Sequence, residues 1–360
     1  MVSFPRIVRA VRERAPVVQC MANRLSALRV ADTLLTSGST PLLNDQPEEL
    51  MAMAKKANAI FFNAVGQPKA VDALVNYRAQ MLQHFSASGS SPEAAPPPLV
   101  VTPSLLWATE DRLDRFVDLM EGARPDVLRA TYPDLKLIFD DVQKHLSGPE
   151  REGVGRAASA AAAAMASKEK DGDRAVEEVA AATAGVAAHF GCIVCAAGPI
   201  DVFAEPPSNS NSRSDNSSSS STHEQDTQTD GNRSTTNTHA QTPPPVPPEG
   251  RLAKLSHVTE THQLARMAAS SATVASLIAA TAVCAPPAPP GSPFVADFFS
   301  STMAAVALYS AAVREASRGG GGGPGSLSVQ VPDALLRLSH KPDTVRADSV
   351  VWLRGTDGES

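Results

Sequence analysis

Two cysteines stand three residues apart in the chain, Cys192 and Cys195. This Cys-x-x-Cys spacing is found in thiol redox pairs and in halves of zinc sites. Both cysteines lie in a continuous apolar run that predicts a strand, where alternate side chains point to opposite faces. We therefore expect two buried structural thiols on opposite faces of a sheet.

Histidines and glycines offer two further kinds of site. His239, His257 and His262 lie in or just beyond a polar segment that cannot build a core, and we expect no metal cluster there. The run Gly319–Gly323 lacks the Lys-Ser/Thr pair that a phosphate-binding P-loop requires. A flexible linker is predicted instead.

Polar residues at the ends of predicted strands are stronger candidates. Arg129 ends one such strand, and ligands of α/β sheets bind outside the carboxyl ends of the strands, so we expect a binding role. Asn23 and Asn63 have similar places, where each can hold a ligand or bond to backbone, and both interpretations stay open. Ser270 and Ser271 precede an apolar helix, which they can cap while offering hydroxyl groups.

The elements that must position these residues alternate along the chain. Strands are predicted at 16–20, 41–43, 59–63, 99–102, 127–129 and 192–195. Helices are predicted at 3–14, 24–37, 47–56, 68–84, 110–122, 157–190, 265–283 and 295–316. Strands alternating with helices predict an α/β fold with a parallel sheet covered on both faces.

The alternation is interrupted by a polar segment. Residues 206–250 are almost all Ser, Asn, Thr, Gln, Pro and charged residues, which predicts a disordered insertion. Neither half alone makes a finished α/β sheet. We therefore predict a single domain formed by 1–205 and 251–345, followed by a C-terminal tail at 346–360.

Composition narrows the possible classes of protein. The 360 residues carry a formal net charge of −6, so nucleic acid is not an expected partner. No uninterrupted apolar stretch of 18 residues is present, so no membrane span is expected. Four scattered cysteines do not make a secreted disulfide scaffold. The arginine-rich start is also typical of a mitochondrial transit peptide, but a first helix and a cytoplasmic location are the expectation.

The order of the elements and several short motifs resemble the hydroxyethylthiazole kinase family. Residues 16–43 (PVVQCMANRLSALRVADTLLTSGSTPLL) match the family's opening strand, turn, long helix and second strand without a gap. Residues 323–338 (GPGSLSVQVPDALLRL) are similar to its closing strand and helix. The resemblance covers nearly the whole chain except 206–250 and parts of 86–98 and 148–170.

The resemblance implies a ribokinase-like three-layer sandwich with a central, mostly parallel sheet flanked by helices. It implies a homotrimer with active sites at subunit interfaces. The implied activity uses ATP and Mg²⁺ to phosphorylate the hydroxyl of 4-methyl-5-(2-hydroxyethyl)thiazole in thiamine biosynthesis. The positions that match the family's thiazole site are Asn23, Pro41, Leu43, Asn63 and the Val65-Gly66 turn. Leu43 replaces a family methionine and keeps an apolar wall.

The resemblance also places a catalytic turn, defined as residues 269–272. The family has Gly-Thr-Gly-Cys there, before an apolar helix, and this chain has Ala269, Ser270, Ser271 and Ala272. Ala272 stands at the cysteine position and cannot accept a proton. A shift of one residue would put Ser271 or Thr273 there instead.

Nucleotide and metal positions are implied in the same way. Arg129, Gly198, Asp201 and Arg266 correspond to nucleotide-binding residues, and Asp134 to a glutamate that can hold Mg²⁺ through water. Thr102 replaces an acidic residue of the family. One lost donor in such a site costs roughly 3–4 kcal/mol of transition-state stabilisation, so a slow kinase is expected.

Two other functions remain open at this level. A catalytically weak or inactive relative would bind a ligand or act as a regulatory or scaffold subunit, with 206–250 as a surface for a protein partner. A sugar or vitamin kinase of the same superfamily would need an acidic base at the catalytic turn, and the turn has none.

Overall fold

The computed structural model describes residues 3–44, 46–63, 66–87, 95–103, 106, 109–146, 171–198, 200–207, 250–256, 270–289, 292, 294–318, 324–345 and 350–354. Most of the predicted insertion, at 208–249, lies outside these residues, as do Val65, Arg266, His239, His257, His262 and Gly319–Gly323.

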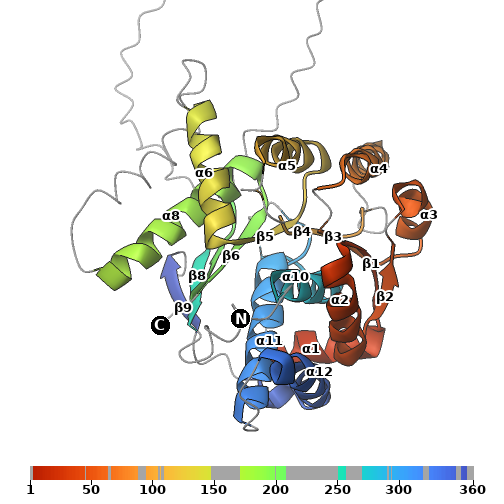
Figure 1. Ribbon diagram of the computed structural model, residues 1–360, viewed down its shortest axis with the longest axis vertical. Coiled ribbons are helices and arrows are strands. Elements are labelled where there is room, and N and C mark those ends of the chain that lie inside the picture. The colour runs from red at the N-terminus through yellow and green to blue at the C-terminus, as the bar shows by residue number, and fades with distance from the viewer. Residues whose placement is uncertain are drawn as a thin grey trace, which may run out of the picture.

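The described strands form one nine-stranded sheet in the order β2-β1-β3-β4-β5-β6-β7-β8-β9 (Figure 1). The strands are β1 (Val17–Ala22), β2 (Thr40–Leu43), β3 (Ala59–Asn63), β4 (Leu99–Val101), β5 (Val127–Thr131), β6 (Ile193–Ala197), β7 (Ile200–Ala204), β8 (Leu252–Ser256) and β9 (Val350–Arg354). The first six pair in parallel, whereas β7, β8 and β9 add antiparallel strands at one edge. The predicted mostly parallel sheet is confirmed.

Helices cover both faces of this sheet. One layer contains α1 (Phe4–Arg14), α2 (Arg24–Ser37), α10 (Ser270–Val283), α11 (Phe298–Arg318) and α12 (Pro324–His340). The other contains α3 (Leu50–Ala54), α4 (Pro68–Ala87), α5 (Glu110–Ala123), α6 (Tyr132–Leu146) and α8 (Asp171–Phe190). Each layer has its own apolar cluster against the sheet, which gives the three layers visible in Figure 1. None of the described helices has the length and hydropathy needed to cross a membrane.

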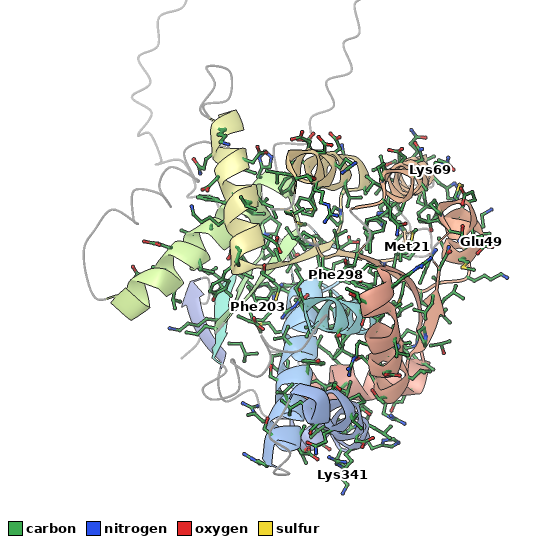
Figure 2. The ribbon with its side chains drawn as sticks, viewed as in Figure 1. Met21, Glu49, Lys69, Phe203, Phe298 and Lys341 are labelled. Carbon is green, nitrogen blue, oxygen red and sulfur yellow. The ribbon has the colours of Figure 1, made fainter. Side chains whose placement is uncertain are left out.

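Successive side chains of a strand point to opposite faces of the sheet, so each strand contributes to both apolar clusters. Cys195 packs in the cluster under α10 and α11, whereas Cys192 packs in the other. Both are free, buried thiols, as predicted. On the α11 side, the ring of Phe203 in β7 lies edge-on to that of Phe299, 6.5 Å between centroids, and Figure 2 shows Phe203 close to the first turn of α11.

Two local features explain where α2 begins and ends. Asn23 is its N-cap and accepts a hydrogen bond from the backbone N–H of Ser26. Gly38 ends it with a φ of 96°, in the left-handed region that favours glycine. A Cβ at Gly38 would lie 3.0 Å from Cγ of Arg12 in α1, so the glycine also permits close helix packing.

The C-terminal elements differ from the expectation. Residues 324–340 form a helix throughout, not a strand followed by a helix. Pro332 lies inside this helix and has no N–H for the carbonyl of Ser328. Nη1 of Arg29 in α2 donates to that carbonyl instead, at 2.5 Å. Residues 350–354, expected to belong to a tail, form β9 and pair with β8.

Candidate functional site

The carboxyl ends of β1 and β3 bring two asparagines into contact. Nδ2 of Asn23 donates to Oδ1 of Asn63 at 3.3 Å. Oδ1 of Asn23 accepts from both the backbone N–H and the hydroxyl of Ser26, each at 3.0 Å. Asn23 is therefore committed to capping α2 and orienting Asn63, whose side chain is buried. Asn23 thus caps α2 and holds Asn63 at the sheet edge.

The remaining thiazole-site candidates lie on the neighbouring segments. Leu43 pairs in register with Cys20 at the end of the edge strand β2, and its side chain is 45% exposed. Pro41 precedes it in the same strand and is half-buried. Gly66 is exposed before α4, and a Cβ there would lie 3.4 Å from Nη2 of Arg112. These positions all lie at the edge of the sheet where the parallel strands end, and Leu43 is the exposed apolar side chain among them.

Residues 270–272 of the catalytic turn form the start of α10, and Ala269 lies outside the described residues. The helix begins at Ser270, and the hydroxyl of Ser271 lies 3.3 Å from that of Thr102, directly after β4. The first backbone N–H groups of a helix have no intrahelical partner and attract anions. Ala272 is buried and brings no reactive group. The sequence did not predict the contact between Thr102 and Ser271, because it joins residues far apart in the chain.

Asp134 lies in the first turn of α6, just after β5. Oδ2 accepts a hydrogen bond from the hydroxyl of Thr131 at 2.8 Å, whereas Oδ1 is buried without a partner among the described residues. Burial raises the pKa of this carboxyl, and the Thr131 hydroxyl and the backbone N–H of Leu106 oppose that shift. A buried carboxylate oxygen without a partner fits a cation.

Arg129 lies inside β5, two residues before the strand ends, and its side chain is buried. Its Nη1 donates to Sγ of Cys195 at 2.9 Å and lies 3.7 Å from Oδ2 of Asp201. Its Nε has no partner among the described residues. The structure therefore directs this guanidinium into the protein, toward β6 and β7, and not outward from a strand end.

The turn between β6 and β7 depends on Asp201. Oδ1 of Asp201 accepts from the backbone N–H of Gly198 at 3.1 Å. Tyr132 closes the other side, since its hydroxyl donates to the carbonyl of Ile200 and a Cβ at Gly198 would collide with its ring. Tyr132 was not predicted as part of the site. The sequence feature that points to Tyr132 is its position directly after the strand β5, next to Thr131.

The described residues contain no group of three or more His, Cys, Asp or Glu side chains that could hold a metal ion. Asp134 is thus a single carboxylate ligand at most. The candidate residues nevertheless follow one edge of the sheet, from Asn63 through Thr102 and Ser271 to Asp134 and Gly198.

Comparisons with known proteins identify relatives of this chain. Hydroxyethylthiazole kinase of Cutibacterium acnes is 28% identical over 193 residues, which cover 53% of this chain and 57% of the relative. The enzyme of the same name from Nitratidesulfovibrio vulgaris is 27% identical over 122 residues, 34% of this chain and 42% of the relative. The chain thus aligns with about half the length of these curated relatives.

A solved structure and a family match cover far more of the chain. The hydroxyethylthiazole kinase structure from Pyrococcus horikoshii superimposes with a TM-score of 0.63 at 18% identity, over 98% of this chain and 99% of that one, which shows a shared fold. Residues 8–341 match the hydroxyethylthiazole kinase family. The chain therefore belongs to the hydroxyethylthiazole kinase family.

Proposed function

We propose that this protein is a slow, ATP-dependent kinase that phosphorylates the hydroxyl of 4-methyl-5-(2-hydroxyethyl)thiazole, and so serves thiamine biosynthesis. The contact between Ser271 and Thr102 carries the proposal. This contact holds the start of α10 against the carboxyl end of β4. The thiazole-site candidates lie at the same edge of the sheet. A phosphoryl group and an alcohol can meet only if these two regions are adjacent.

The thiazole ring is proposed to lie against Leu43 and Pro41, with Asn63 as the polar partner. Leu43 gives an exposed apolar surface at the end of β2, and Asn63 is held in one orientation by Asn23. An apolar wall with a few placed polar groups is the usual form of a small-molecule site. Gly66 would let the ligand approach the backbone before α4.

The transferred phosphoryl group is proposed to face the first N–H groups of α10 and the hydroxyls of Ser270 and Ser271. Phosphoryl transfer depends mainly on positioning and on stabilising negative charge, so a helix start can support it. A positioned general base contributes about 10²–10⁴-fold. Ala272 supplies no general base, so we expect turnover to be slower by about 10²–10⁴-fold.

Magnesium ion is proposed to bind at Asp134. Mg²⁺ keeps several waters and binds through one or two carboxylates together with substrate phosphates. The Oδ1 atom of Asp134, buried without a partner among the described residues, fits this need. When bound, the ion would neutralise charge on the phosphates, and Thr131 would hold the carboxylate in place.

The nucleotide is proposed to lie on the β6–β7 turn, with Gly198 as its backbone surface. Asp201 fixes this turn, and Arg129 fixes Asp201. We therefore assign both buried side chains as positioning residues for the nucleotide. Arg266 is proposed to meet the phosphates directly, as the resemblance implies.

The active form is proposed to be a homotrimer. Three leucines on α2 are exposed, Leu25 by 86%, Leu28 by 69% and Leu35 by 59%. Val329 is exposed on α12, which packs against α2. Exposed apolar side chains that cluster mark an interface. Replacing Leu25 and Leu28 by aspartate should yield monomers in analytical ultracentrifugation; an unchanged sedimentation coefficient would contradict the trimer.

A cytoplasmic location is proposed as well. The described cysteines are all buried free thiols, as expected of a protein in a reducing compartment.

Isothermal titration calorimetry with the thiazole tests the substrate assignment. The unmodified chain should bind it, and Asn63→Leu should weaken binding about tenfold or more, because a buried polar partner is lost. Asn76→Leu changes an exposed asparagine on α4 and should leave binding unchanged. Absence of thiazole binding to the unmodified chain would overturn the assignment, and with it the proposed reaction.

A further inference from the structure

A hollow of about 970 Å³ lies between the last turns of α11 and α12. It is lined by Ala311, Arg314, Glu315, Arg318, Leu336, Arg337, Leu338, His340, Lys341 and Thr344. Figure 2 shows Lys341 at the end of the molecule away from the sheet. The hollow is thus separate from the candidate site at the strand ends, and its volume is that of a small-molecule site.

The residues that line this hollow carry more positive than negative charge, and we call it the basic hollow. Arg337 is bound by Glu315, with 2.7 Å between Nε and Oε1. Within the described part of the chain, no ion-pair partner is found for Arg314, Arg318 or Lys341. The next carboxylate along the chain, Asp343, already pairs with Arg9 at 3.1 Å. Three cations therefore gather around one concavity in a chain whose formal net charge is −6.

Helix ends do not account for this charge. Both α11 and α12 end here, and cations near a helix C-terminus are favoured by its partial negative charge of about half a unit. Two such ends together neutralise about one positive charge. The lining residues include four cations and one carboxylate, so roughly two positive charges remain in excess. The excess attracts an anion.

One wall of the hollow is held by hydrogen bonds to His340, and part of the lining is apolar. Nη2 of Arg12 lies 2.7 Å from Nε2 of His340, and Nδ1 of His340 lies 2.8 Å from the carbonyl of Leu336. Because a guanidinium can only donate, Nε2 accepts from Arg12 and Nδ1 donates to the carbonyl of Leu336. Ala311, Leu336 and Leu338 provide apolar contact surface beside the cations.

We propose that the basic hollow is a second ligand site, which binds a small organic phosphate. The cations Arg314, Arg318 and Lys341 hold the phosphate groups, and the apolar wall receives a ring or chain of the ligand. An inorganic phosphate ion alone would leave most of the 970 Å³ empty. The site is independent of the proposed kinase reaction, because none of its residues lies at the strand ends.

The test uses the full chain in a metal-free buffer at low salt. Inorganic pyrophosphate is titrated calorimetrically into the unmodified chain and into a triple variant, Arg314→Gln, Arg318→Gln, Lys341→Gln. A matched triple variant, Lys55→Gln, Lys56→Gln, Lys136→Gln, removes the same charge at exposed lysines elsewhere. Pyrophosphate should bind the unmodified and matched chains alike, and the first triple variant about tenfold or more weakly.

A chemical label gives a second, independent measurement. Pyridoxal 5′-phosphate carries a phosphate and a ring, and its aldehyde condenses with a lysine amine, releasing water. Borohydride then reduces the imine to a stable secondary amine, which peptide mass spectrometry locates. Lys341 should be labelled ahead of Lys55, Lys56 and Lys136, and pyrophosphate should protect it. The proposal is overturned if pyrophosphate does not bind, if both triple variants bind it equally, or if the label spreads evenly over the exposed lysines.

Discussion

Arg129 and Asp201 face each other across β6, with 3.7 Å between Nη1 and Oδ2, and both side chains are buried. Burial alone would lower the pKa of Arg129, but Cys195 and Asp201 raise it above its usual value. The guanidinium therefore keeps its charge inside the protein. Since Asp201 also accepts from Gly198, one ion pair joins β5, β6, β7 and the turn proposed to meet the nucleotide.

Removing the charge of Asp201 should strongly destabilise the fold. Asp201→Asn leaves Arg129 buried and uncompensated, and the free energy of unfolding should fall by about 3–5 kcal/mol in urea titrations. Asp140→Asn breaks the exposed pair with Lys136 and should change it by less than about 1 kcal/mol. Equal losses for the two variants would contradict the account of the buried pair.

Restoring the family's catalytic turn should raise turnover. The triple variant Ala269→Gly, Ser271→Gly, Ala272→Cys returns the glycines and the cysteine, but it removes the Ser271 hydroxyl and its contact with Thr102. We expect the gain from the thiol and the helix-start N–H groups to exceed that loss, so the rate constant for thiazole phosphorylation should rise about tenfold or more. A variant with the two glycines alone shows how much of the gain comes from the thiol. If the triple variant folds and binds thiazole but turns over no faster, Ala272 does not limit the rate.

The four thiols should resist modification in the folded chain. Burial raises the pKa of Cys195 to about 12 and that of Cys284 to about 11, and it raises the pKa values of Cys20 and Cys192 as well. Ellman's reagent at pH 8 should react slowly with native protein and rapidly in urea. Rapid reaction of Cys192 or Cys195 in native protein would contradict their placement in the two apolar clusters.

Stability should fall in acid partly through Asp297. Burial favours the protonated form, but hydrogen bonds from Arg251 and Ser300 and the charge of Arg251 prevail and lower the pKa of this carboxyl. A carboxyl with a lowered folded-state pKa stabilises the fold above its unfolded pKa of about 3.9. This stabilisation is lost as the pH falls through the folded value.

Urea titrations between pH 6 and pH 2.5 measure this contribution. Asp297→Asn should be less stable than the unmodified chain at pH 6, and the difference should shrink below about pH 4. Asp140→Asn, at an exposed position, controls for a lost carboxylate in general. A difference that is constant with pH would show that the charge of Asp297 does not contribute.

The elements with strong hydrophobic patterns could be predicted from the sequence. The predicted strand at 59–63 coincides with β3, and the helix at 24–37 with α2. The strands β7, β8 and β9 were not predicted as strands, because the polar segment at 206–250 separates β7 from β8 and β9 is a short run in an expected tail. The predicted strand within 323–338 was wrong, since Arg29 supplies the hydrogen bond that Pro332 cannot.

The candidate site could likewise be predicted only in part from the sequence. All four residues, Asn23, Asn63, Thr102 and Ser271, could be named from the sequence, but their pairing depends on contacts between distant segments. Arg129 was expected at a strand end. Because β5 continues to Thr131, the alternation of side chains turns Arg129 toward the core and Asp201.

Transfer of labelled γ-phosphate from ATP to 4-methyl-5-(2-hydroxyethyl)thiazole by the purified chain is the direct test of the proposed reaction. We predict a slow, Mg²⁺-dependent formation of the thiazole phosphate ester. Asp134→Asn should lower the rate about tenfold or more, whereas Asp140→Asn should not. If the chain binds the thiazole and forms no ester, even at high protein concentration, the protein is not a hydroxyethylthiazole kinase in function.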